Sequence, residues 1–255
     1  MKPVCLVIGA GAGIGGNVGK RFAREGYHAA LCRRSDEEGL QALVGAIESE
    51  GGEASGTLLN AIEPGSIEDR VAAIEADIGP IEVVVFNLGA QIGDRSLKDT
   101  SYRAFEVGWQ LATFALFRTA STVFPLMEAR GKGTLLVTSA TAAVRGNAGQ
   151  HSHAAAMGGR RMLCQTLNAE FSPKGIHVAH ILVDGAVDAP DTLGKMLGEE
   201  GFRKLRESRG MEHDGLMLPE KIAETYFHIA QQHRSVWTHE LDLRAYSDTP
   251  WWNHA

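Results

Sequence analysis

Glycines dominate the segment that follows the first apolar run of the chain. Val4-Cys5-Leu6-Val7-Ile8 leads directly into Gly9-Ala10-Gly11-Ala12-Gly13-Ile14-Gly15-Gly16, which opens a helical pattern. Glycine lets the backbone turn sharply, and the unpaired N–H groups at a helix start attract an anion such as a pyrophosphate. The Gly-x-x-x-Gly-x-Gly spacing fits better than a Gly-x-Gly-x-x-Gly reading. The segment therefore predicts a dinucleotide site at Gly9, Gly11, Gly13, Ile14 and Gly15, the alternative being a tight turn without a ligand.

Two arginines follow the second apolar run. Arg33 and Arg34 stand where an acidic side chain would accept from the ribose 2′-hydroxyl of NAD, and neither can accept a hydrogen bond. A guanidinium instead suits the 2′-phosphate of NADP. This pair favours NADP over NAD, unless both arginines are simply solvated.

Histidines are the other candidates for chemistry. His151 and His153 could offer two imidazoles to a metal, but a helix would point them in different directions and no third ligand is identifiable. His177 and His180 are three residues apart in a predicted strand, which puts them on opposite faces. We therefore predict no metal site.

Short apolar runs alternate with amphipathic segments along the chain. Strands are predicted at residues 4–8, 28–32, 54–59, 81–86, 134–138, 177–183 and 237–243, and helices at 14–25, 36–50, 66–78, 102–130 and 153–171. Strands that are apolar on both faces, each followed by a helix, indicate a doubly wound parallel α/β sheet with helices on both sides. We expect a single three-layer α/β/α domain over residues 1–255.

Residues 188–218 interrupt this alternation. The segment mixes charges with several glycines, among them Gly194, Gly198, Gly201 and Gly210, which fits either a lid over a pocket or a solvated surface insertion.

Composition excludes several classes of protein. With 255 residues, 44% of them apolar and 22% charged, the chain can close around one large core, which excludes disorder and a disulfide-stapled miniprotein. A net charge of −6 argues against nucleic acid as a partner. The apolar run at the start is too short for an export signal, and no run is long enough to span a membrane. The three cysteines are odd in number and far apart, so we expect free thiols and a cytoplasmic location.

Several motifs together resemble the short-chain dehydrogenase/reductase family. They are the glycine spacing, Phe86-Asn87-Leu88-Gly89-Ala90, Leu135-Leu136-Val137-Thr138-Ser139-Ala140-Thr141 and Gly175-Ile176-His177-Val178. The resemblance covers residues 2–243 in the expected order and implies a Rossmann-type fold. It also implies that the glycines line the cofactor pyrophosphate and that Arg33 selects NADP. The remaining cofactor contacts that it implies are Asn60 at the adenine, Asn87 and Gly89 at the adenosine ribose, and Gly185 and Val187 beside the nicotinamide.

The catalytic positions of that family are altered in this sequence. The resemblance implies a serine, a tyrosine thirteen residues later and a lysine four residues after that, but these positions fall on Ala140, His153 and Met157. The helix asparagine position falls on Gly108 or Trp109. Ala189 also stands where the family commonly has a threonine for the pyrophosphate.

Two interpretations of this site stay open, and a third fails. In the first, His153 replaces the tyrosine as acid–base group, because imidazole titrates near pH ~6.5 without help from a cation, and Ser139 or Thr141 supplies the hydroxyl. In the second, the chain binds the cofactor without turnover and acts as a regulator or partner subunit. A cofactor-free lyase such as a halohydrin dehalogenase would need serine, tyrosine and arginine at Ala140, His153 and Met157, which supply none of them.

The sequence thus predicts an NAD(P)-binding oxidoreductase of small carbonyl or alcohol substrates, with NADP preferred. The family resemblance implies a homodimer or homotetramer built through the helices at residues 102–130 and 153–171. We expect a small-molecule substrate and neither nucleic acid nor membrane as a partner.

Overall fold

A parallel sheet runs through the centre of the molecule. The computed structural model describes residues 1–89, 96–210 and 215–253. Within them, seven strands form one sheet in the order β3-β2-β1-β4-β5-β6-β7, and every neighbouring pair is parallel. The strands are β1 Val4–Ile8, β2 His28–Arg33, β3 Glu53–Leu58, β4 Ile81–Phe86, β5 Gly133–Ala140, β6 Ile176–Val183 and β7 Glu240–Leu243. The predicted Rossmann-type α/β fold is confirmed.

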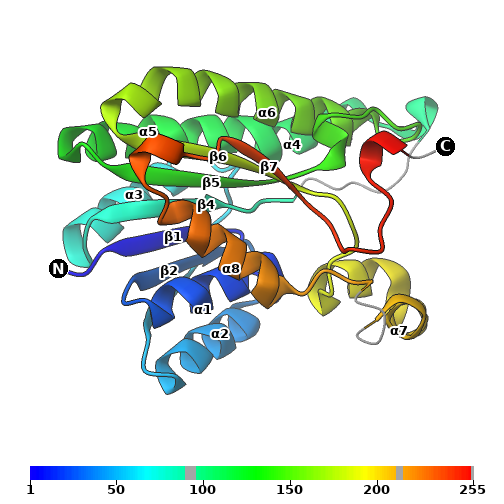
Figure 1. Ribbon diagram of the computed structural model, residues 1–255, viewed down its shortest axis with the longest axis horizontal. Helices are drawn as coiled ribbons and strands as arrows, with labels where there is room; N and C mark the ends of the chain where they lie inside the picture. The colour runs from blue at the N-terminus through cyan, green and yellow to red at the C-terminus, as the bar shows by residue number, and fades with distance from the viewer. Residues whose placement is uncertain (90–95, 211–214, 254–255) are drawn as a thin grey trace.

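Helices cover both faces of this sheet (Figure 1). The α-helices of the described residues are α1 Ile14–Arg24, α2 Glu37–Ser49, α3 Ser66–Asp77, α4 Tyr102–Trp109, α5 Ala115–Arg130, α6 His151–Phe171, α7 Lys195–Arg209 and α8 Pro219–Ala230. One apolar core packs α3, α5 and α6 against the sheet, and the other packs α1, α2 and α8 against the opposite face. The central strands are buried on both faces, which explains their nearly continuous apolar sequence.

The predicted helix over residues 102–130 has an interruption. A π-helical turn, Gln110–Phe114, separates α4 from α5. The apolar spacing continues through this turn, so periodicity alone did not reveal it. The turn matters for the site because it leaves the carbonyl of Ala112 available to a side chain of α6.

Two other differences concern the end of β5 and the segment at residues 188–218. β5 extends to Ala140, beyond the predicted end at residue 138, so that Ser139 lies within the strand and Thr141 begins a 3₁₀ turn. Residues 188–218 contain a π-helical turn, Pro190–Gly194, and then α7, which is kinked at Gly198. Part of this segment, residues 211–214, lies outside the described residues.

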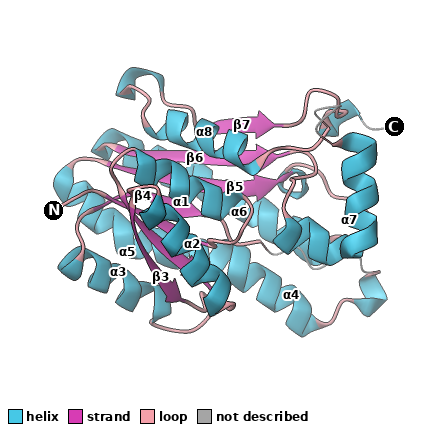
Figure 2. Cartoon of the chain, turned by 90° about the horizontal axis from the view of Figure 1, so that it is seen from below, coloured by secondary structure: helices cyan, strands magenta, loops and turns pink. Residues whose placement is uncertain are grey.

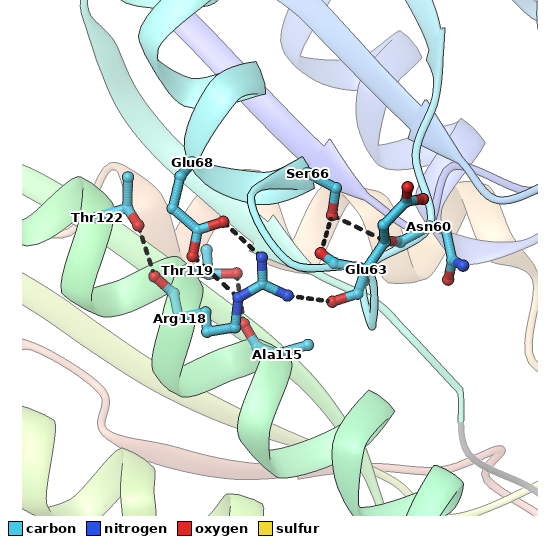
Figure 3. A network of polar contacts seen from close by, with 9 residues as sticks. Asn60, Glu63, Ser66, Glu68, Ala115, Arg118, Thr119 and Thr122 are labelled. Atoms are coloured by element: carbon cyan, nitrogen blue, oxygen red, sulfur yellow. Dashed lines mark hydrogen bonds and ion pairs between the residues drawn. The ribbon is translucent and has the colours of Figure 1, made fainter.

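The loop after β3 is held by an arginine from α5 (Figure 3). Arg118 donates to the carboxylate of Glu68 on α3 at 2.9 Å and to the carbonyl of Ala61 at 2.8 Å. The hydroxyl of Ser66 donates to the carbonyl of Asn60 at 2.8 Å. These bonds fix the loop that carries Asn60, a predicted adenine contact.

All the strands end at the same edge of the sheet. Figure 2 shows β5, β6 and β7 pointing toward the side where α7 lies. The glycine-rich turn after β1, Arg33 at the end of β2, Asn87 after β4 and Ser139 near the end of β5 therefore share this edge. Ligands of open α/β sheets bind at this edge, where the strand order reverses between β1 and β4.

Candidate active site at the carboxyl edge of the sheet

The glycine-rich turn is packed against the end of β4. Gly9 has φ +103°, and a Cβ added there would lie 2.6 Å from the carbonyl oxygen of Asn87. The side-chain amide of Asn87 donates to the carbonyl of Gly9 at 2.9 Å. Only glycine fits this position without moving the neighbouring strand end.

The start of α1 is open to an anion. Gly13 precedes the helix, and no side chain of the described part of the chain caps it. A Cβ on Gly11 would meet nothing within 4 Å, so the turn leaves space in front of its backbone. The N–H groups at the start of α1 and the helix dipole suit a pyrophosphate, and the residues present therefore fit a dinucleotide.

A cleft of about 270 Å³ lies in front of this turn. The glycine-rich turn contributes Gly9, Gly11, Gly13, Ile14 and Gly15 to its lining. The end of β4 contributes Asn87, Leu88 and Gly89, and the segment after β6 contributes Val187, Ala189 and Thr192. The remaining lining residues come from β5 and α6 and are Thr138, Ser139, Ala140, His153, Met157 and Arg160.

The altered catalytic positions therefore meet the glycine-rich turn in one cleft. His153 lies in the first turn of α6 and is 7% exposed, and Ser139 is 5% exposed. The hydroxyl of Ser139 donates to the sulfur of Met157, which packs among Ala112, Ala142 and Ala156. Of the two hydroxyl residues expected beside His153, Ser139 lines the cleft and Thr141 does not.

A buried arginine was not among the predicted site residues. Arg160, one turn after Met157 on α6, is 1% exposed and donates to the carbonyls of Leu88 at 2.8 Å, Thr138 at 2.6 Å and Ala112 at 2.9 Å. Burial lowers the pKa of its guanidinium to about 10. Its three-residue spacing from Met157 is the sequence signal that could have placed it on the cleft side of the helix.

Of the predicted contacts for the adenosine half, Asn87 and Gly89 line the cleft, whereas Arg33, Arg34 and Asn60 do not. Arg33 is half-buried and paired with two carboxylates, whereas Arg34 is exposed. Asn60 lies after β3, and its buried side-chain oxygen has no hydrogen-bond partner among the described residues, so it could accept from an adenine amino group. The structure thus places Arg33, Arg34 and Asn60 outside the lining of the cleft around His153.

The turn after β6 is held by the C-terminal tail. A Cβ on Gly185 would lie 2.7 Å from Oδ2 of Asp248, and Gly185 does not line the cleft. The carboxylate of Asp184 accepts from the Arg244 side chain at 3.1 Å and from the backbone N–H of Trp251 at 3.0 Å. Asp184 therefore holds the C-terminal tail by these two hydrogen bonds. Val187, three residues later, lines the cleft.

Metal and thiol chemistry find little support in the site. Among the described residues, no group of three or more His, Cys, Asp or Glu side chains could hold a metal ion. Cys5, Cys32 and Cys164 are free and buried, and burial raises the pKa of all three thiols, to about 11 for Cys32. A protonated, buried thiol is a poor nucleophile.

None of the described helices has the length and apolar character needed to cross a membrane.

Comparisons with known proteins identify the family. Residues 3–193 match the sequence profile described as short chain dehydrogenase. The chain belongs to the short-chain dehydrogenase family. The short-chain reductase protein NovJ of Streptomyces niveus is 30% identical to this short-chain dehydrogenase over 233 residues, which cover 90% of this chain and 87% of NovJ.

Solved structures agree with this assignment. The short-chain dehydrogenase from Rhodopseudomonas palustris is 32% identical, with a TM-score of 0.80 over 96% of this chain and 99% of that chain. The alcohol dehydrogenase of Thermococcus sibiricus, complexed with 5-hydroxy-NADP, has a TM-score of 0.81 at 23% identity over 98% of this chain and 99% of that chain. At that identity the second likeness concerns the fold alone. The short-chain dehydrogenase described here therefore has the oxidoreductase fold of its family, with His153 and Met157 in its cleft.

Proposed function

We propose that this short-chain dehydrogenase binds a nicotinamide dinucleotide, NADP in preference to NAD, and interconverts a small carbonyl compound and its alcohol. The observation that carries the proposal is the single cleft shared by the glycine-rich turn, Ser139 and His153. The bare start of α1 supports binding of the pyrophosphate. Arg33 supports the preference for a 2′-phosphate.

In this proposal the bound cofactor supplies or accepts the hydride. The imidazole of His153 gives a proton to the substrate oxygen during reduction and takes it back during oxidation, which an imidazole can do near neutral pH. The hydroxyl of Ser139 exchanges its contact with Met157 for a hydrogen bond to the same oxygen. The apolar side chain of Met157 excludes water from this end of the cleft.

The test combines binding with turnover. NADPH and NADH are titrated by fluorescence, and a panel of small ketones and aldehydes is assayed with the wild type, His153→Ala and His151→Ala. His151 is the matched control because it lies exposed in the same helical turn and outside the cleft lining. We expect His153→Ala to lower kcat by roughly 100-fold or more, with NADPH affinity unchanged. His151→Ala should stay within about twofold of the wild type.

Two outcomes would overturn parts of this proposal. Equal turnover by His153→Ala and the wild type would exclude His153 as the acid–base group. Tight NADPH binding by a wild type that reduces no member of the panel would favour the cofactor-binding regulator instead.

A further inference from the structure

Arg33, the residue proposed to select NADP, already has two carboxylate partners. Its Nη2 lies 2.7 Å from Oδ2 of Asp36 and 2.8 Å from Oδ2 of Asp191. The Arg33 side chain is 14% exposed, so most of it is out of contact with solvent. A cation buried to this extent and paired twice binds a further anion less readily than a free one.

The two carboxylates have different structural duties. Asp36 is local: its side chain accepts from the backbone N–H of Gly39 at 3.0 Å and caps the start of α2. Asp191 is distant in sequence and comes from the π-helical turn after β6. Replacing Asp36 would therefore also remove the cap of α2. Replacing Asp191 would remove no helix cap among the described residues.

Asp191 bridges Arg33 to the glycine-rich turn. Burial alone would raise the pKa of this carboxyl, but the hydrogen bond from Arg33, the charges of Lys195 and Arg33 and the backbone N–H of Ala12 lower it. The carboxylate therefore stays charged at neutral pH. It faces a guanidinium and a backbone N–H of a glycine-rich turn, the donor set that a phosphate monoester also uses.

The neighbouring residues bring this segment close to the turn. A Cβ on Gly13 would lie 2.9 Å from Cβ of Ala189, two residues before Asp191. The ion pair of Lys195 with Asp191, at 3.7 Å, adds a second cation on the side of α7. The Asp191 carboxylate is thus held by Arg33 on one side and by Lys195 of α7 on the other.

We propose that Asp191 is a specificity-determining residue whose carboxylate competes with the 2′-phosphate of NADP for the guanidinium of Arg33. The inference rests on the proposed function, since it concerns the adenosine end of that same site. A 2′-phosphate must replace the Asp191 carboxylate on Arg33, and Asp191 then keeps Lys195 as its partner. The ribose hydroxyl of NAD carries no charge and requires no such exchange. Asp191 therefore makes the ratio of NADPH to NADH affinity smaller than Arg33 alone would make it.

The experiment measures binding of four nucleotides to the full chain. NADPH, NADH, adenosine 2′,5′-bisphosphate and AMP are titrated by fluorescence or calorimetry against the wild type, Asp191→Asn, Asp191→Ala and Asp188→Asn. Asp188→Asn is the matched control because Asp188 pairs with Arg206 of α7, at 2.8 Å, and not with Arg33. Thermal unfolding of each variant checks that it is folded.

We expect both Asp191 variants to bind NADPH and the bisphosphate about tenfold more tightly, because a competing negative charge is removed. NADH and AMP should change by less than about twofold, as should every nucleotide with Asp188→Asn. In an Arg33→Ala background, Asp191→Asn should give no gain for NADPH.

The outcomes separate this inference from the proposed function. If the wild type binds NADPH and the Asp191 variants leave the ratio of NADPH to NADH affinity unchanged, the role of Asp191 is wrong and the proposed function stands. A gain that survives in Arg33→Ala would also contradict competition at Arg33. If no nucleotide binds any variant, the proposed function fails and this inference fails with it.

Discussion

The hydroxyl of Ser139 lies 3.9 Å from the sulfur of Met157, so β5 and α6 meet at the base of the cleft through a serine and a thioether. The family resemblance implies a lysine at the position where this chain has Met157. Here the side chain is 2% exposed and packs among alanines, and the cation of this region is Arg160, one turn further along α6. The positive charge of this region thus lies at position 160 and not at position 157, and its partners are the carbonyls of Leu88, Ala112 and Thr138.

Met157→Lys should therefore destabilise the protein. The new ammonium would be buried in an apolar cluster beside the existing cation of Arg160, and an uncompensated buried charge costs about 3 kcal/mol or more in free energy of unfolding. Met157→Leu, which conserves volume, should cost less than about 1.5 kcal/mol. Urea unfolding at pH 7 measures both. Equal midpoints for the two variants would show that the cluster tolerates a charge.

Arg160 should contribute more to stability than its neighbour Arg161. Arg160→Met would leave the buried carbonyl of Ala112 and the partly buried carbonyls of Leu88 and Thr138 without this donor, and we expect a loss of about 3 kcal/mol in unfolding free energy. Arg161 is partly exposed and pairs with Glu240, so Arg161→Met should cost about 1 kcal/mol. Urea denaturation of the two variants checks this order, and a smaller loss for Arg160→Met would contradict it.

The elements and the edge of the sheet were predictable because their signals are local. Apolar runs and the glycine spacing place β1, the turn and α1, and the order of strands then brings Asn87 and Ser139 to the same edge. Helix α8 was missed, although Pro219 at its first position and the spacing of Ile222, Tyr226 and Ile229 are local helix signals.

Contacts between distant segments were beyond the reach of these patterns. Arg33 and Asp191 are 158 residues apart, and no periodicity links them. Arg160 donates to the carbonyl of Ala112, which lies in a π-helical turn that the apolar spacing did not reveal. The cofactor end of the site could thus be predicted by residue type, whereas the partners of its charged groups required the structure.

The stability of the protein should fall as the pH drops from about 6.5 to about 4. His180 is fully buried, and burial lowers its pKa to about 4 despite the nearby Glu240. The unfolded chain therefore takes up this proton at a higher pH than the folded protein, which stabilises the unfolded state as the pH falls. The full effect of one such histidine is about 3 kcal/mol, reached near the lower end of this range.

The contribution of His180 can be separated from that of other groups by substitution. Urea midpoints are measured at pH 7.5 and pH 4.5 for the wild type, His180→Gln and His228→Gln, the last on an exposed position of α8. We expect the difference between the two pH values to shrink in His180→Gln alone. The same pH dependence in all three proteins would assign the loss of stability to other residues.

An exposed aromatic stripe on α4 and α5 predicts self-association. Phe105, Trp109, Phe114 and Phe117 are each between 42% and 50% exposed, and the rings of Trp109 and Phe114 stack with centroids 5.6 Å apart. Contiguous exposed apolar residues of this kind mark an interface, and the stripe lies on the helices through which we propose a homodimer or homotetramer.

Trp109→Arg and Phe117→Arg should each weaken this assembly at least about tenfold, because a charge would be buried at the centre of the interface. Sedimentation or light scattering over a range of micromolar concentrations measures the shift toward monomer. Tyr246→Arg is the control, since Tyr246 is 80% exposed and belongs to the segment after β7 and not to α4 or α5. A wild type that is monomeric throughout, or arginine variants with the same mass as the wild type, would show that the stripe does not hold subunits together.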